Sequence, residues 1–180
     1  MKKTFSLLLI ASLLASGCGS PRPREYFNQA VLNCNALYGF ASSYELERDL
    51  ATPSEKLIDE KTMAMAPVTR AETVKGKLAR AEENYQKVKS LPATGDAKEM
   101  VDASNALYEF VLPVYKNEYA ALAALYDANA PADKIEAAAK NITDKYAAKF
   151  EGLYNAVMKA GTAYAEKNGI EVRAVNPSPR

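Results

Sequence analysis

The chain has 180 residues, of which 48% are hydrophobic and 25% charged, and its 23 basic side chains nearly balance its 22 acidic ones. It contains no histidine, which excludes the usual zinc sites, the Ser-His and Cys-His nucleophile pairs and an imidazole general base. The balanced charge also argues against nucleic acid as a partner, because phosphate contacts require an excess of Lys and Arg on one face. The composition favours a protein with neither a metal site nor catalytic activity.

Residues 1–17 have the composition of a secretory signal peptide. Two lysines follow Met1, and an apolar stretch then runs from Phe5 to Leu14. This stretch is too short to cross the roughly 30 Å hydrocarbon core of a membrane as a stable helix. We therefore expect the segment to be removed, and we exclude it from the fold.

The sequence LASGC at residues 14–18 resembles the lipobox of bacterial lipoproteins, although that family usually has Leu where this chain has Ala15. The resemblance implies that Cys18 carries a covalent diacylglycerol and, after cleavage before it, an N-acyl chain such as palmitate. No other cofactor is expected. Several buried acyl chains anchor a protein stably to a membrane. In this family Gly19 in place of Asp favours the outer membrane, with the periplasmic face as the default and surface exposure left open.

A second interpretation of the leader stays open, because Ala15, Ser16 and Gly17 also suit ordinary signal peptidase. Cleavage by that enzyme would release a soluble protein that begins at Cys18. The two interpretations differ in their cysteine chemistry. A lipidated Cys18 leaves Cys34 as a single thiol, whereas two free thiols make an even pair that an oxidising compartment can bridge.

Residues 18–24 are expected to be the lipidated cysteine and a short tether that contains two prolines. Over residues 25–170 apolar side chains recur three or four positions apart, which predicts a domain of amphipathic helices. The first long helix is expected over about 24–49. Cys34 falls on its core-facing stripe, where an unpaired thiol behaves as a small hydrophobic group. Residues 50–69 are expected to form a short helix followed by a break.

The second long helix is expected over about residues 70–91, because Thr69 and Glu72 have the spacing of a capping box. The third long helix carries the clearest periodicity in the chain. That periodicity continues through Pro113, so the proline is expected to kink the helix rather than end it.

The fourth long helix is expected to begin directly after Pro131 and to end at a left-handed cap around Gly169. Residues 171–180 are expected to be a flexible tail. Four long amphipathic helices with short connections, and no convincing strand, predict an all-α antiparallel bundle. A short extra helix is expected between the first and second long helices.

Tyrosine is the most unusual part of the composition, with eleven residues that fall mostly on the apolar stripes. Its ring is apolar and its tip polar, so a cluster around the kink at Pro113 is a candidate pocket for an apolar or amphipathic ligand. The candidate lining residues are Tyr108, Tyr115, Tyr119, Tyr126, Tyr146 and Phe150. The competing interpretation places these rings at the margin of the core with their hydroxyls in water.

The helical domain is similar in architecture to the small, largely uncharacterised helical lipoproteins of bacterial envelopes. This resemblance favours a non-catalytic protein that is anchored to the membrane by its lipid and that binds another envelope protein. The alternative is a periplasmic carrier or sensor with an apolar ligand in the tyrosine-lined pocket. An enzyme comes third, since few mechanisms remain without His or a reactive Cys.

Overall fold

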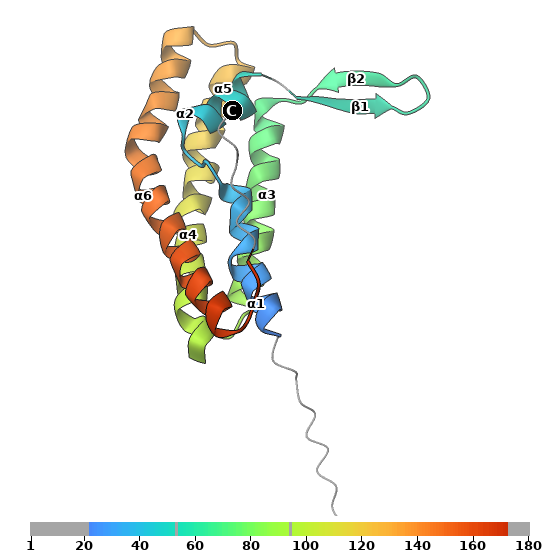
Figure 1. The fold of residues 1–180 in the computed structure, drawn as a ribbon. Coiled ribbons are helices and arrows are strands. Elements are labelled where there is room, and N and C mark those ends of the chain that lie inside the picture. Colours follow the sequence, from blue (N-terminus) through green and yellow to red (C-terminus); the bar gives the residue numbers. More distant parts are fainter. Residues whose placement is uncertain (1–21, 53, 94, 173–180) are drawn as a thin grey trace, which may run out of the picture.

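A computed structural model describes residues 22–52, 54–93 and 95–172. Over these ranges the chain is mostly helical, with one small antiparallel sheet, and its long helices lie side by side (Figure 1). The coarse all-α prediction is therefore confirmed. The predicted signal peptide, Cys18 and most of the predicted tether and tail lie outside the described residues. Within those ranges, no helix combines the length and the hydropathy that a membrane span needs.

The first predicted helix is broken into short pieces, so the prediction of one helix over 24–49 is wrong. The pieces are α1 (Pro23–Ala30), the 3₁₀ helix η1 (Leu32–Leu37), α2 (Ser43–Leu46) and the π-helical turn η2 (Glu47–Ala51). Between η1 and α2 the φ angle is +79° at Gly39 and +61° at Ala41. A left-handed residue cannot continue a right-handed helix, which is why the helix stops there.

Residues 55–67 form a β-hairpin in place of the expected short helix. β1 (Glu55–Asp59) pairs antiparallel with β2 (Ala64–Pro67), and Leu57 lies opposite Met65. The hairpin projects sideways from one end of the helices (Figure 1). It is held at its base by a hydrogen bond of 2.7 Å from the amide of Val68 to the carbonyl of Ser54.

The turn of the hairpin explains why helix does not form here. The carboxylate of Asp59 accepts hydrogen bonds from the amides of Lys61, at 2.8 Å, and Thr62, at 3.3 Å. An Asp that binds the amides after it stabilises a turn in competition with helix. Met63, at the end of this turn, has a φ angle of +53°. The short helix predicted within residues 50–69 is therefore wrong.

α3 (Arg70–Lys89) begins where its capping spacing predicts. The hydroxyl of Thr69 accepts a hydrogen bond from the amide of Glu72, and the carboxylate of Glu72 accepts one from the amide of Thr69, each at 3.1 Å. This reciprocal pair satisfies two amides that a helix start otherwise leaves unpaired. The predicted capping box is confirmed.

The third predicted helix is a continuous helical run with one irregular turn. It consists of α4 (Lys98–Val114), the π-helical turn η4 (Tyr115–Tyr119) and α5 (Ala120–Asp127), and it follows a short 3₁₀ turn, η3 (Gly95–Ala97). Pro113 lies inside α4, two residues before the π turn. A wider turn is one way for a helix to accommodate a proline, which has no amide to donate. The prediction that the helix continues through Pro113 is confirmed.

The start of α3 is joined to the end of α5 and to the end of η2. The carboxylate of Asp127 accepts hydrogen bonds of 2.9 Å from the amides of both Arg70 and Ala71. The guanidinium of Arg70 in turn donates to the carbonyls of Leu50, at 3.1 Å, and Ala51, at 3.4 Å. The end of η2, the start of α3 and the end of α5 therefore meet at one place.

α6 (Ala132–Lys167) packs mainly against α4, and also against α1 and α5. It begins directly after Pro131, as predicted. At its end Gly169 has a φ angle of +63°, and the amide of Ile170 donates to the carbonyl of Ala165 at 2.8 Å. This is the bonding of a left-handed helix cap, so the predicted cap is confirmed.

A close approach between α6 and the end of α1 generates a testable prediction. A Cβ atom at Gly161 would lie 2.6 Å from a methyl carbon of Val31, whose side chain is buried. We expect Gly161→Ala to lower the free energy of unfolding by about 1–3 kcal/mol, because overpacking outweighs the helix propensity of alanine. Urea denaturation measures the change.

Gly152 supplies the matched control, because it lies on the same helix and a Cβ atom there would meet nothing within 4 Å. We expect Gly152→Ala to raise the free energy of unfolding by about 0.5–1 kcal/mol. An equal gain at both positions would contradict the close approach at Gly161.

Candidate functional site

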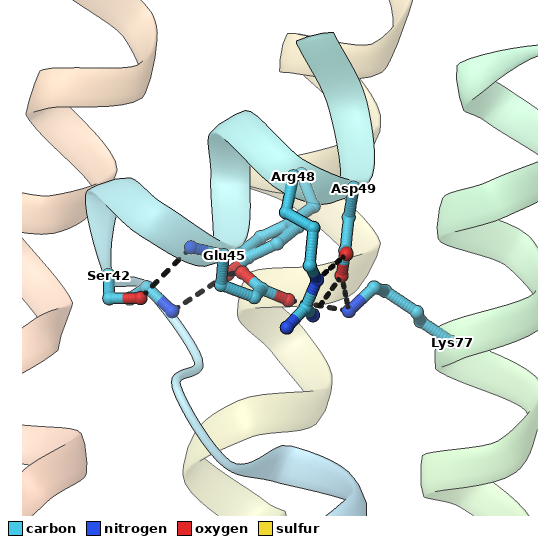
Figure 2. A network of polar contacts seen from close by, with 7 residues as sticks. Ser42, Glu45, Arg48, Asp49 and Lys77 are labelled. Carbon is cyan, nitrogen blue, oxygen red and sulfur yellow. Dashed lines mark hydrogen bonds and ion pairs between the residues drawn. The ribbon is translucent and has the colours of Figure 1, made fainter. Parts of the chain in front are cut away.

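Glu45 is the only charged side chain that is buried among the described residues, with 2% of its surface exposed. It lies on α2, whose first turn is capped by Ser42: the serine hydroxyl accepts a hydrogen bond of 3.1 Å from the amide of Glu45. This cap orients the short helix so that the carboxylate of Glu45 points into the molecule toward α3 (Figure 2). A charge at this depth is stable only if other groups pair with it.

Both oxygens of the Glu45 carboxylate are paired. The Lys77 ammonium, on α3, donates to one oxygen at 2.5 Å, and the Tyr119 hydroxyl, on η4, donates to the other at 2.7 Å. The Tyr119 hydroxyl also accepts a hydrogen bond of 2.8 Å from the amide of Ala41. The Glu45 carboxylate thereby joins α2 to α3 and to η4. The bond from Ala41 to the Tyr119 hydroxyl supports the left-handed backbone that precedes α2.

The cluster contains a second acidic and a second basic group (Figure 2). Lys77 also pairs with Asp49 on η2, and Arg48 donates to Asp49 from Nε at 2.5 Å and from a terminal nitrogen at 2.9 Å. Although burial raises the pKa of Asp49, hydrogen bonds from Arg48 and Lys77 hold it below the ordinary value. Two carboxylates thus balance two cations, and the cluster is electrically neutral.

This cluster of Glu45, Arg48, Asp49, Lys77 and Tyr119 has a structural character, and we call it the joint. Burial, and then the nearby charge of Glu45, raise the pKa of Tyr119 far above its ordinary value, so its hydroxyl remains a proton donor. Burial raises the pKa of Tyr115 in the same way. Neither tyrosine is poised to act as a base or nucleophile near neutral pH, because such a role needs a lowered pKa.

Three of the six predicted pocket residues, Tyr115, Tyr119 and Phe150, belong to an aromatic cluster beside this joint. The ring of Phe40 lies 5.1 Å from that of Tyr115, 5.3 Å from that of Tyr119 and 5.1 Å from that of Phe150, between centroids. Phe40, Tyr115 and Tyr119 are almost completely buried. These three predicted residues therefore pack around Phe40, which we did not include among the candidates.

The other three predicted residues do not pack directly on Phe40, although Tyr146 is linked to it through the ring of Phe110. Tyr108 is fully buried next to Tyr85, with 5.9 Å between ring centroids. Tyr126 lies under the guanidinium of Arg70, 5.7 Å from it. The Tyr146 hydroxyl donates to the carboxylate of Glu118 at 2.9 Å.

Each of four hollows in the described surface is lined by only one of the predicted residues. One hollow between η1 and α3 includes Tyr115, two along α6 include Tyr126 and Phe150, and one beside Pro113 includes Tyr146. The structure therefore does not bring the six residues together around a shared cavity.

Cys34 lies in the core, as its position on the apolar stripe predicts. Its side chain is fully buried, and its sulfur lies 3.2 Å from the carbonyl oxygen of Ala30 and 3.3 Å from the hydroxyl of Ser104. Burial raises the pKa of the Cys34 thiol, which disfavours the reactive thiolate. Cys34 acts as a packing residue.

Among the described residues, the hairpin β1–β2 carries the largest group of exposed apolar side chains outside the helices. The exposed fractions are 42% for Leu57, 60% for Ile58, 69% for Met63 and 50% for Met65. We did not anticipate this surface, because we expected helix at these positions. The alternation of Met63, Ala64, Met65 and Ala66, after an Asp that favours a turn, was the available signal for a strand.

Comparison with protein families, with curated proteins and with solved structures found no match for the chain. Over the described ranges the structure also contains no group of three or more His, Cys, Asp or Glu residues arranged to hold a metal ion. The functional interpretation therefore depends on the geometry of the chain itself.

The joint at Glu45 generates a second prediction. Tyr119→Phe leaves one buried carboxylate oxygen and the amide of Ala41 without their partner. We expect this variant to lower the free energy of unfolding by about 2–4 kcal/mol, since each unsatisfied buried group costs about 1–3 kcal/mol. Chemical denaturation at pH 7 measures the loss.

Tyr115→Phe is the matched control for this variant. The Tyr115 ring is equally buried and lies 4.7 Å from that of Tyr119, but its hydroxyl takes no part in the hydrogen bonds to Glu45 and Ala41. We expect Tyr115→Phe to change the free energy of unfolding by less than about 1 kcal/mol. Equal losses in the two variants would mean that Tyr119 contributes only its ring.

Proposed function

We propose that the protein is a non-catalytic lipoprotein of a bacterial envelope, which is anchored through Cys18 and docks on another envelope protein through the hairpin β1–β2. The observation that carries this proposal is the exposure of four large apolar side chains on the hairpin: Leu57, Ile58, Met63 and Met65. Gly19, which follows the lipidated cysteine where an Asp would favour the inner membrane, supports the outer membrane, with the periplasmic face as the default.

The hairpin is the part of the chain that most needs a partner. A two-stranded hairpin is marginally stable in water unless it packs against something else. In this one all five residues of β1 are exposed, so the hairpin buries no core of its own. Several large apolar side chains that stay exposed on one short hairpin, beside the charged Glu55, Lys56 and Asp59, are typical of a protein interface.

The position of the hairpin favours a partner away from the anchoring membrane. The hydroxyl of Tyr26, near the start of α1, donates to the carbonyl of Pro92, just after the end of α3, at 3.3 Å. The hairpin directly precedes the other end of α3, whose 20 residues span about 30 Å. The hairpin and the start of α1 therefore lie at opposite ends of the helices (Figure 1). With a short tether at Cys18, the hairpin lies at the end of the helices that is farther from the membrane.

In this proposal the helices form an antiparallel four-helix bundle that serves as a stalk. The segment α1–η1–α2 takes the place of the first helix, and α3, the run α4–η4–α5 and α6 supply the other three. The contacts of the first segment with α6 support this arrangement, because Tyr26 lies near Tyr164 at one end and Phe40 near Phe150 further along. The two segments run in opposite directions.

The anchor is tested by metabolic labelling with palmitate. We expect the label in the wild-type protein and in a Cys34→Ser control, and its complete loss in Cys18→Ala, because Cys18 alone occupies the lipobox position. An intact mass of the mature protein provides a second measurement. A wild-type protein without label, or with the mass of an unmodified chain, would overturn the lipoprotein proposal.

The docking surface is tested by crosslinking of the native protein in cells. We expect a variant with Leu57, Ile58, Met63 and Met65 all changed to Ser to lose its crosslinked complex but to keep its stability, because all four side chains are exposed. Leu32→Ser, which removes an apolar side chain that is 46% exposed on η1, is the matched control and should keep the complex. A complex that survives in the hairpin variant, or a wild-type protein recovered only as a monomer, would contradict the proposal.

A further inference from the structure

The hairpin β1–β2 has two outer edges, because the sheet of the described residues contains only these two strands. An outer edge presents backbone amides and carbonyls that no strand of the same sheet binds, and such an edge can accept a strand from another molecule. The register of the hairpin shows which of its two edges is open.

Residues of β1 point their backbone groups alternately toward β2 and away from it. At the base of the hairpin the amide of Val68 donates to the carbonyl of Ser54, so these two residues form a hydrogen-bonded pair. The pairs that follow are Glu55 with Pro67, Lys56 with Ala66 and Leu57 with Met65. Bonded and non-bonded pairs alternate in an antiparallel sheet. The amides and carbonyls of Glu55 and Leu57 therefore point away from β2, to the outer edge of β1.

The outer edge of β2 lacks one of its donors. By the same alternation its outward residues are Met65 and Pro67, and a proline has no amide to donate. A proline at an outward position protects an edge strand against pairing. Glu55 and Leu57 both carry an amide, so the edge of β1 is the open one.

The side chains beside the open edge leave one face of the hairpin accessible. Lys56 points to the face that is turned toward α3, because its ammonium bonds to the carboxylate of Glu72 at 2.6 Å. Side chains alternate between the two faces of a strand, so Glu55 and Leu57 point to the opposite face. There Leu57 lies across from Met65, and both side chains are exposed. A strand added to β1 covers Leu57 and extends this apolar pair into a row of three.

The charges along β1 argue against a second copy of this chain as the added strand. Antiparallel self-pairing through the outward residues has three registers, which place Glu55 opposite Glu55, Lys56 opposite Lys56, or Glu55 opposite Asp59. Like charges directly opposite each other are destabilising. A strand of another protein avoids this repulsion, and it complements the edge when it carries a Lys or Arg opposite Glu55 and an apolar side chain opposite Leu57.

We propose that an extended strand of another envelope protein pairs with the outer edge of β1 and exchanges backbone hydrogen bonds with Glu55 and Leu57. This strand has a basic residue and an apolar residue two positions apart, which lie opposite Glu55 and Leu57. The docking function proposed above, on which this inference rests, thereby gains a partner of defined chemistry. A third strand also supplies what the hairpin lacks, since a sheet needs three strands with an apolar face, or packing against a helix, for independent stability.

Proline substitutions at outward positions test the pairing, with crosslinking of the native protein in cells as the measurement. Leu57→Pro removes an outward amide but no bond of the hairpin, whereas Leu57→Ala shortens the same side chain and keeps the amide. We expect about tenfold less crosslinked complex for Leu57→Pro than for Leu57→Ala, because the proline lacks the donor and its ring obstructs the added strand. Met65→Pro and Met65→Ala are the matched control on the edge of β2, and both should give the same amount of complex.

The outcomes separate the strand pairing from the docking function. Equal amounts of complex for Leu57→Pro and Leu57→Ala would overturn the strand pairing and leave docking through side chains in place. A wild-type protein that forms no complex would instead contradict the docking function itself.

Photocrosslinking provides a second measurement, which leaves the backbone of the hairpin unchanged. Benzoylphenylalanine replaces Glu55 in one variant and Leu57 in another, and mass spectrometry identifies the partner residues that each variant labels. We expect both variants to label one extended segment of the partner, at residues two positions apart, because facing residues of paired strands advance together. Labels three or four residues apart, as on a helix, would overturn the proposal, and labels on a second copy of this chain would contradict the choice of partner.

Discussion

The arrangement of the first third of the domain depends on the contacts of one buried carboxylate, that of Glu45. A buried charge costs several kcal/mol unless it is paired, and here the partners are Lys77 on α3 and Tyr119 on η4. The same tyrosine hydroxyl binds the amide of Ala41, which has a left-handed backbone. One carboxylate therefore holds an irregular segment against two long helices and compensates for its strain.

The proposed docking surface is built next to this segment. η2 precedes the hairpin, and the guanidinium of Arg70 holds the end of η2 by its bonds to the carbonyls of Leu50 and Ala51. The strained turn at Gly39 and Ala41 is thus the feature that separates this domain from a plain helical bundle.

Local rules predicted the parts of the fold that depend on neighbouring residues. The capping box of Thr69, the continuation through Pro113 and the cap at Gly169 are all confirmed, because each involves residues within one or two helical turns. The broken first helix depends on Glu45 and Lys77, which are 32 residues apart, so the local periodicity predicted one unbroken helix there. Ser42 and Glu45 do have the spacing of a capping box, and this signal could have marked the start of α2.

Hydrogen exchange in Lys77→Met tests the central claim, that the ion pair of Glu45 holds the irregular segment in place. Lys75→Met, on the exposed side of α3, is the matched control. Amides of residues 43–51 should exchange at least about tenfold faster in Lys77→Met, which corresponds to about 1.4 kcal/mol of local stability, while α4 and α6 stay protected. Unchanged protection at residues 43–51, or an equal loss across all the helices, would contradict the account.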